Sequence, residues 1–370
     1  FDLPINQPFS FPSLQFLYRK TGHLGTLSQV RLGLQTRLAT DVADMIFQRH
    51  GQTLVRATED CQPHPARYHP PVPHFLFIIA FSVVSLRLVA ADAEKEFAQI
   101  LQADNAAITQ ITSWIHNNLD RIQENETERD ALALRIRDRL APIRQQYIDF
   151  LKRHPQHARA RVAYGSFLTH IDHRQGAIDQ WKQALKTDPK NAAALNNLAI
   201  HLGTIALQTR QTRGIQEAFR ALDKAIQLNP KEPLYRHNFA TLLCSFRQPA
   251  ARYYKIKPQQ ITQKAIGEYD AAIKLSPKKF EYAADRAEAF LDLIPFPHAE
   301  AIRAWQATLA IAETPDERDW AYLQTAIAHF KGEQWKHVTS TLKRMTGEHH
   351  QALAGQLRRA TEAKLNEPKP

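Results

Sequence analysis

The sequence predicts an all-α fold in which helical hairpins stack as a solenoid, preceded by a long helical hairpin. Three observations lead to this prediction: glycine is scarce, apolar residues recur at helical spacing, and one short phrase is repeated along the chain. Only 12 of the 370 residues are glycine, which disfavours a fold built on many tight turns and bulges. Apolar residues make up 44% and charged residues 23%, proportions that are typical of a folded globular chain.

The repeated phrase marks the end of a helix. It reads ALKTDPKN from Ala184, AIQLNPKE from Ala225 and AIKLSPKK from Ala272, with a proline at the same place in each copy. Proline cannot continue a helix, and the residue before it avoids the helical conformation, so each copy should end a helix. Recurrence of this kind indicates an array of helical units, because one such unit cannot bury its apolar face alone.

The first unit lies between Pro155 and Pro189, an interval of 34 residues. A large-small-large set in its first helix and an alanine-aromatic-alanine set in its second are carried by Tyr164, Gly165, Leu168, Ala177, Trp181 and Ala184. This pattern resembles the tetratricopeptide repeat. The resemblance implies four to five repeats over residues 156–350, a solvating helix and tail over 351–370, and a right-handed superhelix with a concave groove. It also implies that Trp181, Tyr269 and Trp305 are packing residues.

The later units depart from the 34-residue spacing. The second is lengthened by GTIALQTRQTRG and the third by RQPAARYYKIKPQQ. The fourth loses the proline at its end, and the fifth keeps only FKGEQW and an apolar stripe, so it is interpreted as degenerate. The array is therefore predicted to be regular in its helix pairing and irregular in its loops.

The first 93 residues do not follow this pattern. Residues 1–72 are unassigned and are interpreted as disordered or as an over-extended start. Residues 73–93 resemble a signal peptide, because Phe75–Val84 is apolar almost without interruption and Ala91-Asp92-Ala93 forms a small-x-small site. We expect a mature start near Asp92 or Glu94 and a periplasmic or secreted location. The alternatives are a membrane anchor over residues 73–91 and a buried core helix.

Residues 94–155 are expected to form a long antiparallel hairpin. Apolar residues at helical spacing run from Phe97 to Ile122 and again from Leu132 to Leu151, separated by the polar stretch ENETERD. Pro142 is expected to kink the second helix. The hairpin either caps the array or pairs with another copy of the chain, and the second possibility allows a homo-oligomer.

The sequence offers no motif that indicates catalysis or metal binding. The two histidine pairs, His154 with His157 and His170 with His173, lack a cysteine or carboxylate that would complete a metal site. Nucleotide-binding and hydrolase motifs are missing from the sequence. The formal charge of +11 is interspersed along helices, which indicates a solvated surface and not a nucleic-acid partner. The prediction is a protein that is not an enzyme and has no metal or other cofactor.

The predicted function is a non-enzymatic scaffold that binds a protein or peptide in the concave groove. By resemblance, the groove is lined by the first helix of each repeat, and its lining should change from mildly basic to acidic along the array. The candidate residues are Arg159, His170, Asn196, Asn197, His237, Asn238, Thr241, Glu281, Glu288 and Asp292.

Two qualifications accompany this prediction. Asn197 and Asn238 also have a structural interpretation, in which their side chains bond to a neighbouring helix. Val162, Ser166, Ala284 and Glu288 occupy positions where relatives that hold an acidic chaperone tail have lysine, asparagine or arginine, so that partner is not predicted. The alternative function is an oligomerisation or membrane-tethered scaffold that acts through the hairpin; if the signal is cleaved, no membrane insertion is expected.

Overall fold

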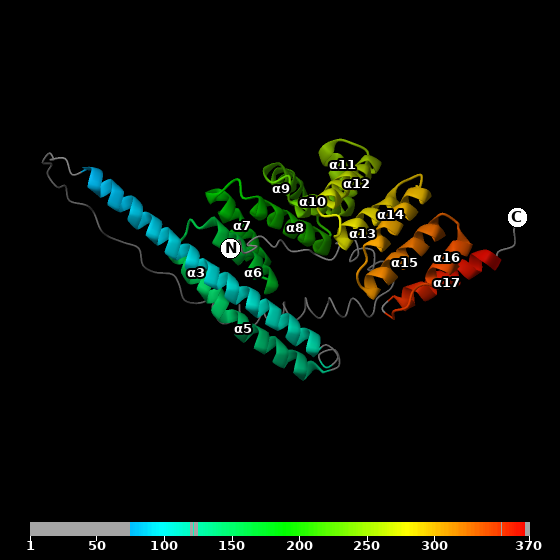
Figure 1. The fold of residues 1–370 in the computed structure, drawn as a ribbon, viewed down its shortest axis with the longest axis horizontal. Helices are drawn as coiled ribbons and strands as arrows, with labels where there is room; N and C mark the ends of the chain where they lie inside the picture. The colour runs from blue at the N-terminus through cyan, green and yellow to red at the C-terminus, as the bar shows by residue number, and fades with distance from the viewer. Residues whose placement is uncertain (1–74, 119–120, 122–124, 349, 367–370) are drawn as a thin grey trace. The chain divides into compact units, whose positions relative to one another are not determined.

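The structure is a computed structural model that describes residues 75–118, 121, 125–348 and 350–366. All regular elements within these residues are helices (Figure 1), which confirms the predicted all-α class. The described chain divides into two compact units, one ending at Pro189 and the other beginning at Lys190. We refer to them as the N-terminal unit and the C-terminal unit.

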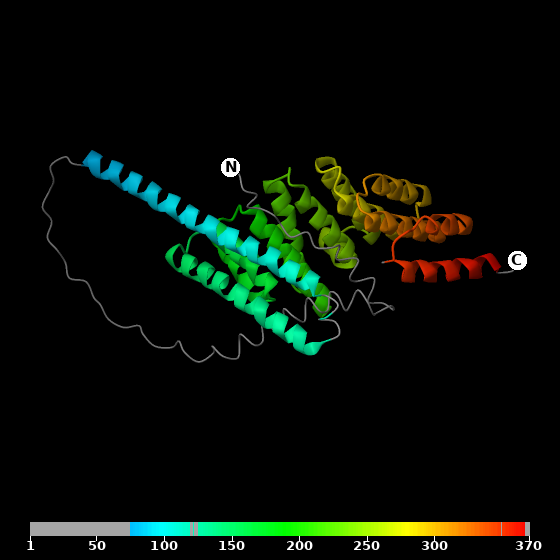
Figure 2. The ribbon, with the colours of Figure 1, turned by 60° about the horizontal axis from the view of Figure 1, so that its bottom comes forward.

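The N-terminal unit contains four described helices. They are α3 (Phe75–Asn117), α5 (Glu126–Arg153), α6 (Ala158–His170) and α7 (Arg174–Thr187). Helices α3 and α5 lie side by side as a long hairpin (Figure 2), and α6 and α7 form the first repeat. Pro142 lies inside α5, which continues through it for three further turns to Arg153.

Helix α3 passes through the apolar segment in which the signal peptide is predicted. Residues 73 and 74 lie outside the described residues, and no side chain from Phe75 to Ala90 is described, so the signal remains a prediction. The unassigned segment 1–72 also lies outside them. Across the residues whose side chains are described, no helix combines the length and apolar character that a membrane span needs.

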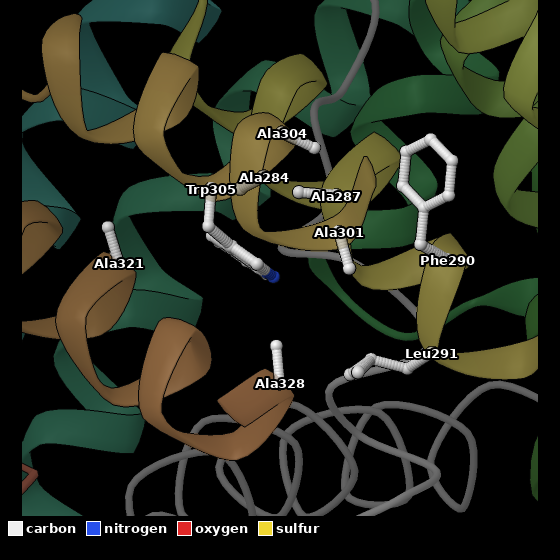
Figure 3. Packing of buried hydrophobic residues seen from close by; sticks show 9 residues of the cluster. All are labelled: Ala284, Ala287, Phe290, Leu291, Ala301, Ala304, Trp305, Ala321 and Ala328. Atoms are coloured by element: carbon white, nitrogen blue, oxygen red, sulfur yellow. The ribbon is translucent and has the colours of Figure 1, made fainter. Parts of the chain in front are cut away.

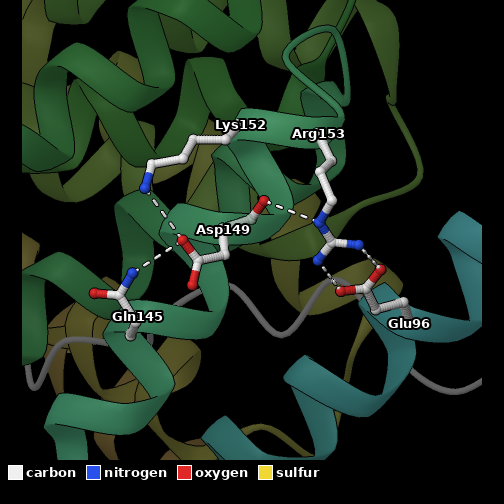
Figure 4. Close-up of polar contacts among 5 residues, drawn as sticks. All are labelled: Glu96, Gln145, Asp149, Lys152 and Arg153. Atoms are coloured by element: carbon white, nitrogen blue, oxygen red, sulfur yellow. Dashed lines mark hydrogen bonds and ion pairs between the residues drawn. The ribbon is translucent and has the colours of Figure 1, made fainter.

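Polar contacts on the surface fasten the hairpin (Figure 4). The guanidinium of Arg153 on α5 pairs with both carboxylate oxygens of Glu96 on α3, and its Nη1 lies 2.7 Å from Glu96 Oε2. This hydrogen bond lowers the pKa of Glu96. Beside it, Asp149 accepts hydrogen bonds from Gln145 at 2.9 Å and from Lys152 at 3.2 Å. Of these contacts only the Arg153–Glu96 pair joins the two helices, whereas the Asp149 contacts lie within α5; because the groups are solvated, each contributes little to stability.

A buried polar pair lies inside the same hairpin. The hydroxyl of Tyr147 donates a hydrogen bond of 2.7 Å to Oδ2 of Asp104, while Oδ1 of that carboxyl is buried without a hydrogen-bond partner among the described residues. Burial raises the pKa of Asp104 to about 6, because a carboxylate is poorly solvated there. The hairpin therefore carries an unfavourable charge at neutral pH.

Substitution of Asp104 by Asn should stabilise the N-terminal unit at pH 7 by about 1–3 kcal/mol. The folded pKa of about 6 exceeds the reference value of 3.8, so wild-type stability should fall as pH rises between these values. The amide stays neutral and can still accept the Tyr147 hydrogen bond. Urea unfolding at pH 4 and pH 7 measures the difference, which should disappear near pH 4. The solvated residue Asp149 offers a control, because Asp149→Asn should not stabilise the protein; equal effects of both variants would contradict the interpretation.

The C-terminal unit is a succession of helical hairpins (Figure 1). Its elements are α8 (Ala192–Thr209), α9 (Ile215–Leu228), α10 (Pro233–Ser245), α11 (Arg247–Tyr254), α12 (Pro258–Leu275), α13 (Phe280–Ala289), the 3-10 turn η1 (Phe290–Asp292), α14 (His298–Ala310), α15 (Pro315–Lys331), α16 (Trp335–Leu342) and α17 (Gln351–Asn366). The pairs are α8 with α9, α10 with α12, α13 with α14 and α15 with α16. Helix α11 is an extra element inside the third repeat.

The repeated phrase ends a helix in each copy, as predicted. Helices α7, α9 and α12 end at Thr187, Leu228 and Leu275, two residues before Pro189, Pro230 and Pro277. At each end the residue before the proline donates its backbone N–H to the carbonyl of the phrase's first alanine. The turn after the proline then leads into the next first helix, so the phrase fixes the start of each repeat.

Small residues where helices cross and one large residue between them build the core of the fourth repeat (Figure 3). Trp305 is fully buried among a cluster that comprises Ala284, Ala287, Phe290, Leu291, Ala301, Ala304, Ala321 and Ala328. The alanines let the helix backbones approach, and the indole fills the space that remains. Trp181 and Tyr269 are also buried, at 2% and 0% exposure, so the packing role predicted for the three aromatic residues agrees with their burial.

A glycine in the first repeat is required by the same close approach. A Cβ atom on Gly165 of α6 would lie 2.5 Å from Nε1 of Trp181 on α7, and that indole N–H donates to the carbonyl of Val162 at 3.1 Å. Contact this short forces the indole to move, so the two helices of the hairpin could not keep their spacing.

Substitution of Gly165 by Ala should therefore destabilise the first repeat by about 1–3 kcal/mol, although alanine is the better helix former. Gly267 is the matched control: it also lies inside a helix, α12, and a Cβ there would meet no atom within 4 Å. Gly267→Ala should stabilise by about 0.5–1 kcal/mol. Thermal unfolding followed by circular dichroism measures both changes; the same sign for both would refute the packing argument.

Candidate functional site

The ten predicted groove residues are divided between the two units. Arg159 and His170 lie in the N-terminal unit, on α6, and the other eight lie in the C-terminal unit, on α8, α10, α13 and η1. We describe each group within its own unit.

In the N-terminal unit, Arg159 is engaged by the hairpin. Its guanidinium lies 2.8 Å from Oε2 of Glu94 and 5.7 Å from the centre of the Phe97 ring, both on α3. Arg159 therefore links the first repeat to the hairpin. His170 is the last residue of α6. Burial lowers the pKa of its imidazole to about 4, so the imidazole is neutral at pH 7.

In the C-terminal unit, the first helices of three successive repeats concentrate buried polar residues. Seven of the thirteen buried polar or charged residues of the described chain lie on α8, α10 and α13: Asn196, His201, His237, Asn238, Thr241, Asp285 and Glu288. Helix α10 contacts α8 on one side and α13 on the other. We call these three helices the polar row.

One end of the polar row is joined by an asparagine chain. Nδ2 of Asn238 on α10 donates to Oδ1 of Asn196 on α8 at 2.9 Å, and Nδ2 of Asn196 donates to Oδ1 of Asn197 at 3.1 Å. The bond to a neighbouring helix that the structural interpretation expected for Asn238 is therefore present. An amide both donates and accepts hydrogen bonds, so Asn196 accepts from Asn238 and donates to Asn197. The bond between Asn238 and Asn196 also fixes the spacing of α8 and α10.

The other side of α10 is joined to α13 by a histidine and an aspartate. Nε2 of His237 lies 2.9 Å from Oδ2 of Asp285, and both side chains are buried. The imidazole stacks on Tyr282 with ring centres 4.5 Å apart, and the hydroxyls of Thr241 and Tyr269 are 3.0 Å apart. The polar row is thus cross-linked between each pair of neighbours.

The sequence prediction missed Asp285, the partner of His237. A signal for it was present, because Asp285 follows Glu281 by four residues and therefore shares its helix face. The aromatic partner Tyr282 gave no such signal, since its contact with His237 depends on how two repeats stack.

The predicted acidic residues at the end of the polar row differ in their surroundings. Glu281 is exposed, with Oε2 3.3 Å from Nζ of Lys279, whereas Glu288 is buried at 7% exposure. Asp292 in η1 lies 3.6 Å from the guanidinium of Arg247. Only Glu281 among the three is exposed, so the accessible acidic charge on these residues is small.

A histidine cluster lies near the C-terminal end of the array. Nε2 of His298 on α14 is 3.3 Å from Nδ1 of His329 on α15, and His337 on α16 stacks on His329 with ring centres 5.1 Å apart. Burial, together with these two neighbours, lowers the pKa of His329 to about 4. Among the described residues, no three side chains are placed to hold a metal ion. The cluster was missed because its members come from three different helices.

A double-mutant cycle on His237 and Asp285 tests the cross-link between α10 and α13. Each alanine substitution should destabilise the C-terminal unit by about 1–3 kcal/mol, because the remaining partner stays buried without its hydrogen bond. The coupling energy between the two sites should be about 1–2 kcal/mol.

The control cycle uses Arg286 and Asp270, a solvated ion pair that also involves α13. Its coupling energy should be below about 1 kcal/mol. Urea unfolding supplies all the required free energies. A coupling for His237 and Asp285 no larger than that of the control would show that the buried bond does not connect the helices.

Comparisons with known proteins find only distant structural similarity. No family model and no curated protein sequence matches the chain. Among solved structures, MamA aligns with 54% of this chain and 96% of its own at 18% identity and a TM-score of 0.40. YrrB, described as a TPR protein with an unusual peptide-binding site, aligns with 59% of this chain and 97% of its own at 13% identity and 0.43. PilF of Pseudomonas aeruginosa aligns with 71% and 99% at 16% identity and 0.44.

Proposed function

We propose that this protein, whose repeats resemble the tetratricopeptide repeat, is a non-enzymatic scaffold that holds a protein or peptide along the first helices of its repeats. The observation that carries the proposal is the polar row on α8, α10 and α13. By the repeat pattern, Asn196, His237 and Thr241 in this row hold positions that are expected to line the groove, and the bonds of Asn196 to Asn238 and of His237 to Asp285 join the three helices. Surfaces that are ordered before binding lose less entropy when a partner docks.

The accessible members of the row suit a polypeptide partner. Asn197 is half-buried on α8, and Glu281 is exposed on α13. An amide and a carboxylate offer hydrogen bonds to backbone N–H groups and to basic side chains. An extended row of helices favours a segment of chain over a small molecule, because small ligands are bound by enclosed cavities.

Site-specific photo-crosslinking tests this function and identifies the partner in the same experiment. A photoreactive amino acid is placed at Asn197, at Glu281, or at Lys224 as a control, which is exposed on the second helix α9. After irradiation in cells, the first two positions should give the same discrete crosslinked species, identified by mass spectrometry. The control position should not give it.

Two outcomes would contradict the proposal. One is a crosslinked species that forms at Lys224 and at neither inner position. The other is the lack of any discrete species at Asn197 and Glu281 when the chain is folded and present at its normal level. The Glu281→Lys variant provides a further check, because reversal of the accessible charge should reduce the yield at Asn197 if the partner is basic at that point.

A further inference from the structure

The two insertions that lengthen the second and third repeats lie next to each other in the C-terminal unit. The first is the loop from Arg210 to Gly214 between α8 and α9, and the second begins with α11. Two cavities, of about 500 and about 550 Å³, lie between them. Thr212 from the first insertion and Pro249 from the second line both cavities, so the two spaces adjoin. We call them the insertion site.

Positive charge dominates the insertion site. Its lining includes five arginines, Arg210, Arg213, Arg220, Arg247 and Arg252, against the two carboxylates of Glu217 and Asp292. Arg247 lies 3.6 Å from Asp292. The other four arginines are exposed, and no ion pair with a described residue engages them. Guanidinium groups bind carboxylates through two parallel hydrogen bonds, so this cluster suits an acidic ligand.

The start of α9 adds to the positive potential. The helix begins after Gly214, which provides no side chain to cap the first turn, and Gly214, Ile215 and Gln216 line the smaller cavity. The backbone N–H groups of a first helical turn carry partial positive charge. The helix start and the arginines of this cavity therefore both make its electrostatic potential more positive.

The larger cavity is partly apolar. Ala206, Leu207, Phe246 and Pro249 contribute to its lining. The Oγ of Ser245, which also lines it, is buried without a hydrogen-bond partner among the described residues. This cavity can accept an apolar side chain and offers one hydrogen bond beside it. The combination favours a polypeptide with mixed acidic and apolar residues over a uniformly charged polymer.

We propose that the insertion site docks an acidic segment of a partner protein, with an apolar side chain in the larger cavity and carboxylates at Arg213, Arg220 and Arg252. This inference rests on the proposed scaffold function and assigns a class of partner to a second surface, distinct from the polar row. The two insertions lengthen the second and third repeats, and both contribute arginines to one place.

Fluorescence anisotropy on the full chain tests the proposal. The probe is a short fluorescein-labelled peptide in which pairs of glutamates alternate with single leucines; the comparison peptide has glutamine at each glutamate. At physiological ionic strength the acidic peptide should bind saturably, and the glutamine peptide should bind at least about tenfold more weakly. The double substitution Arg213→Glu with Arg252→Glu should lower the affinity for the acidic peptide by at least about tenfold. Arg359→Glu, at an exposed arginine on α17, should leave its affinity unchanged.

Several outcomes would overturn it. One is the absence of saturable binding, and another is equal affinity for the wild type and the doubly substituted chain. Binding of a single-stranded oligonucleotide of equal charge as tightly as the peptide would indicate a nucleic-acid surface instead. Because the substituted arginines are exposed, circular dichroism should show an unchanged fold. The crosslinks from Asn197 and Glu281 should survive the double substitution, so failure here is distinguishable from failure of the scaffold function.

Discussion

The structure depends on one constraint: a helical hairpin with a single apolar face must bury that face against its neighbours. The first alanine of each repeated phrase, Ala184, Ala225 and Ala272, is completely buried. At each of these places the second helix meets another helix closely enough that only a small side chain fits. The space left between the backbones is filled by residues such as Trp305. Each copy of the alanine in the sequence therefore corresponds to one close contact between helices in the structure.

The polar row is a consequence of the same constraint. Close packing brings the first helices of neighbouring repeats within reach of short side chains, so an asparagine on α10 can bond directly to one on α8. Burial of a polar group costs less when the group is hydrogen-bonded, and in the row Asn238 pairs with Asn196 and His237 with Asp285 across neighbouring helices. Each pair also fixes the register of one repeat on the next, which apolar contacts alone define less sharply.

The sequence predicted what is local and periodic. The ends of α7, α9 and α12, the packing role of Trp181 and the all-α class could be predicted because each follows from the residues of one repeat. The contacts of His237 with Asp285 and of His298 with His329 could not, because the partners are 48 and 31 residues apart and meet only through stacking. Arg159 shows the limit of a family pattern: its position in the repeat indicated the groove, while its nearest carboxylate, Glu94, lies on the hairpin outside the repeats.

The insertions are the places where the packing constraint is weakest. Residues of a repeat helix are restricted to a few types by their contacts, whereas Arg210 and Arg213 lie in a loop and are exposed. Such positions can acquire charge without a cost in packing. The helices that precede the two insertions, α8 and α10, are nevertheless joined to each other by the buried Asn238–Asn196 bond. An array with a restricted core and variable loops thus holds a specific pattern of charge in a defined position, and this is the property that a binding scaffold requires.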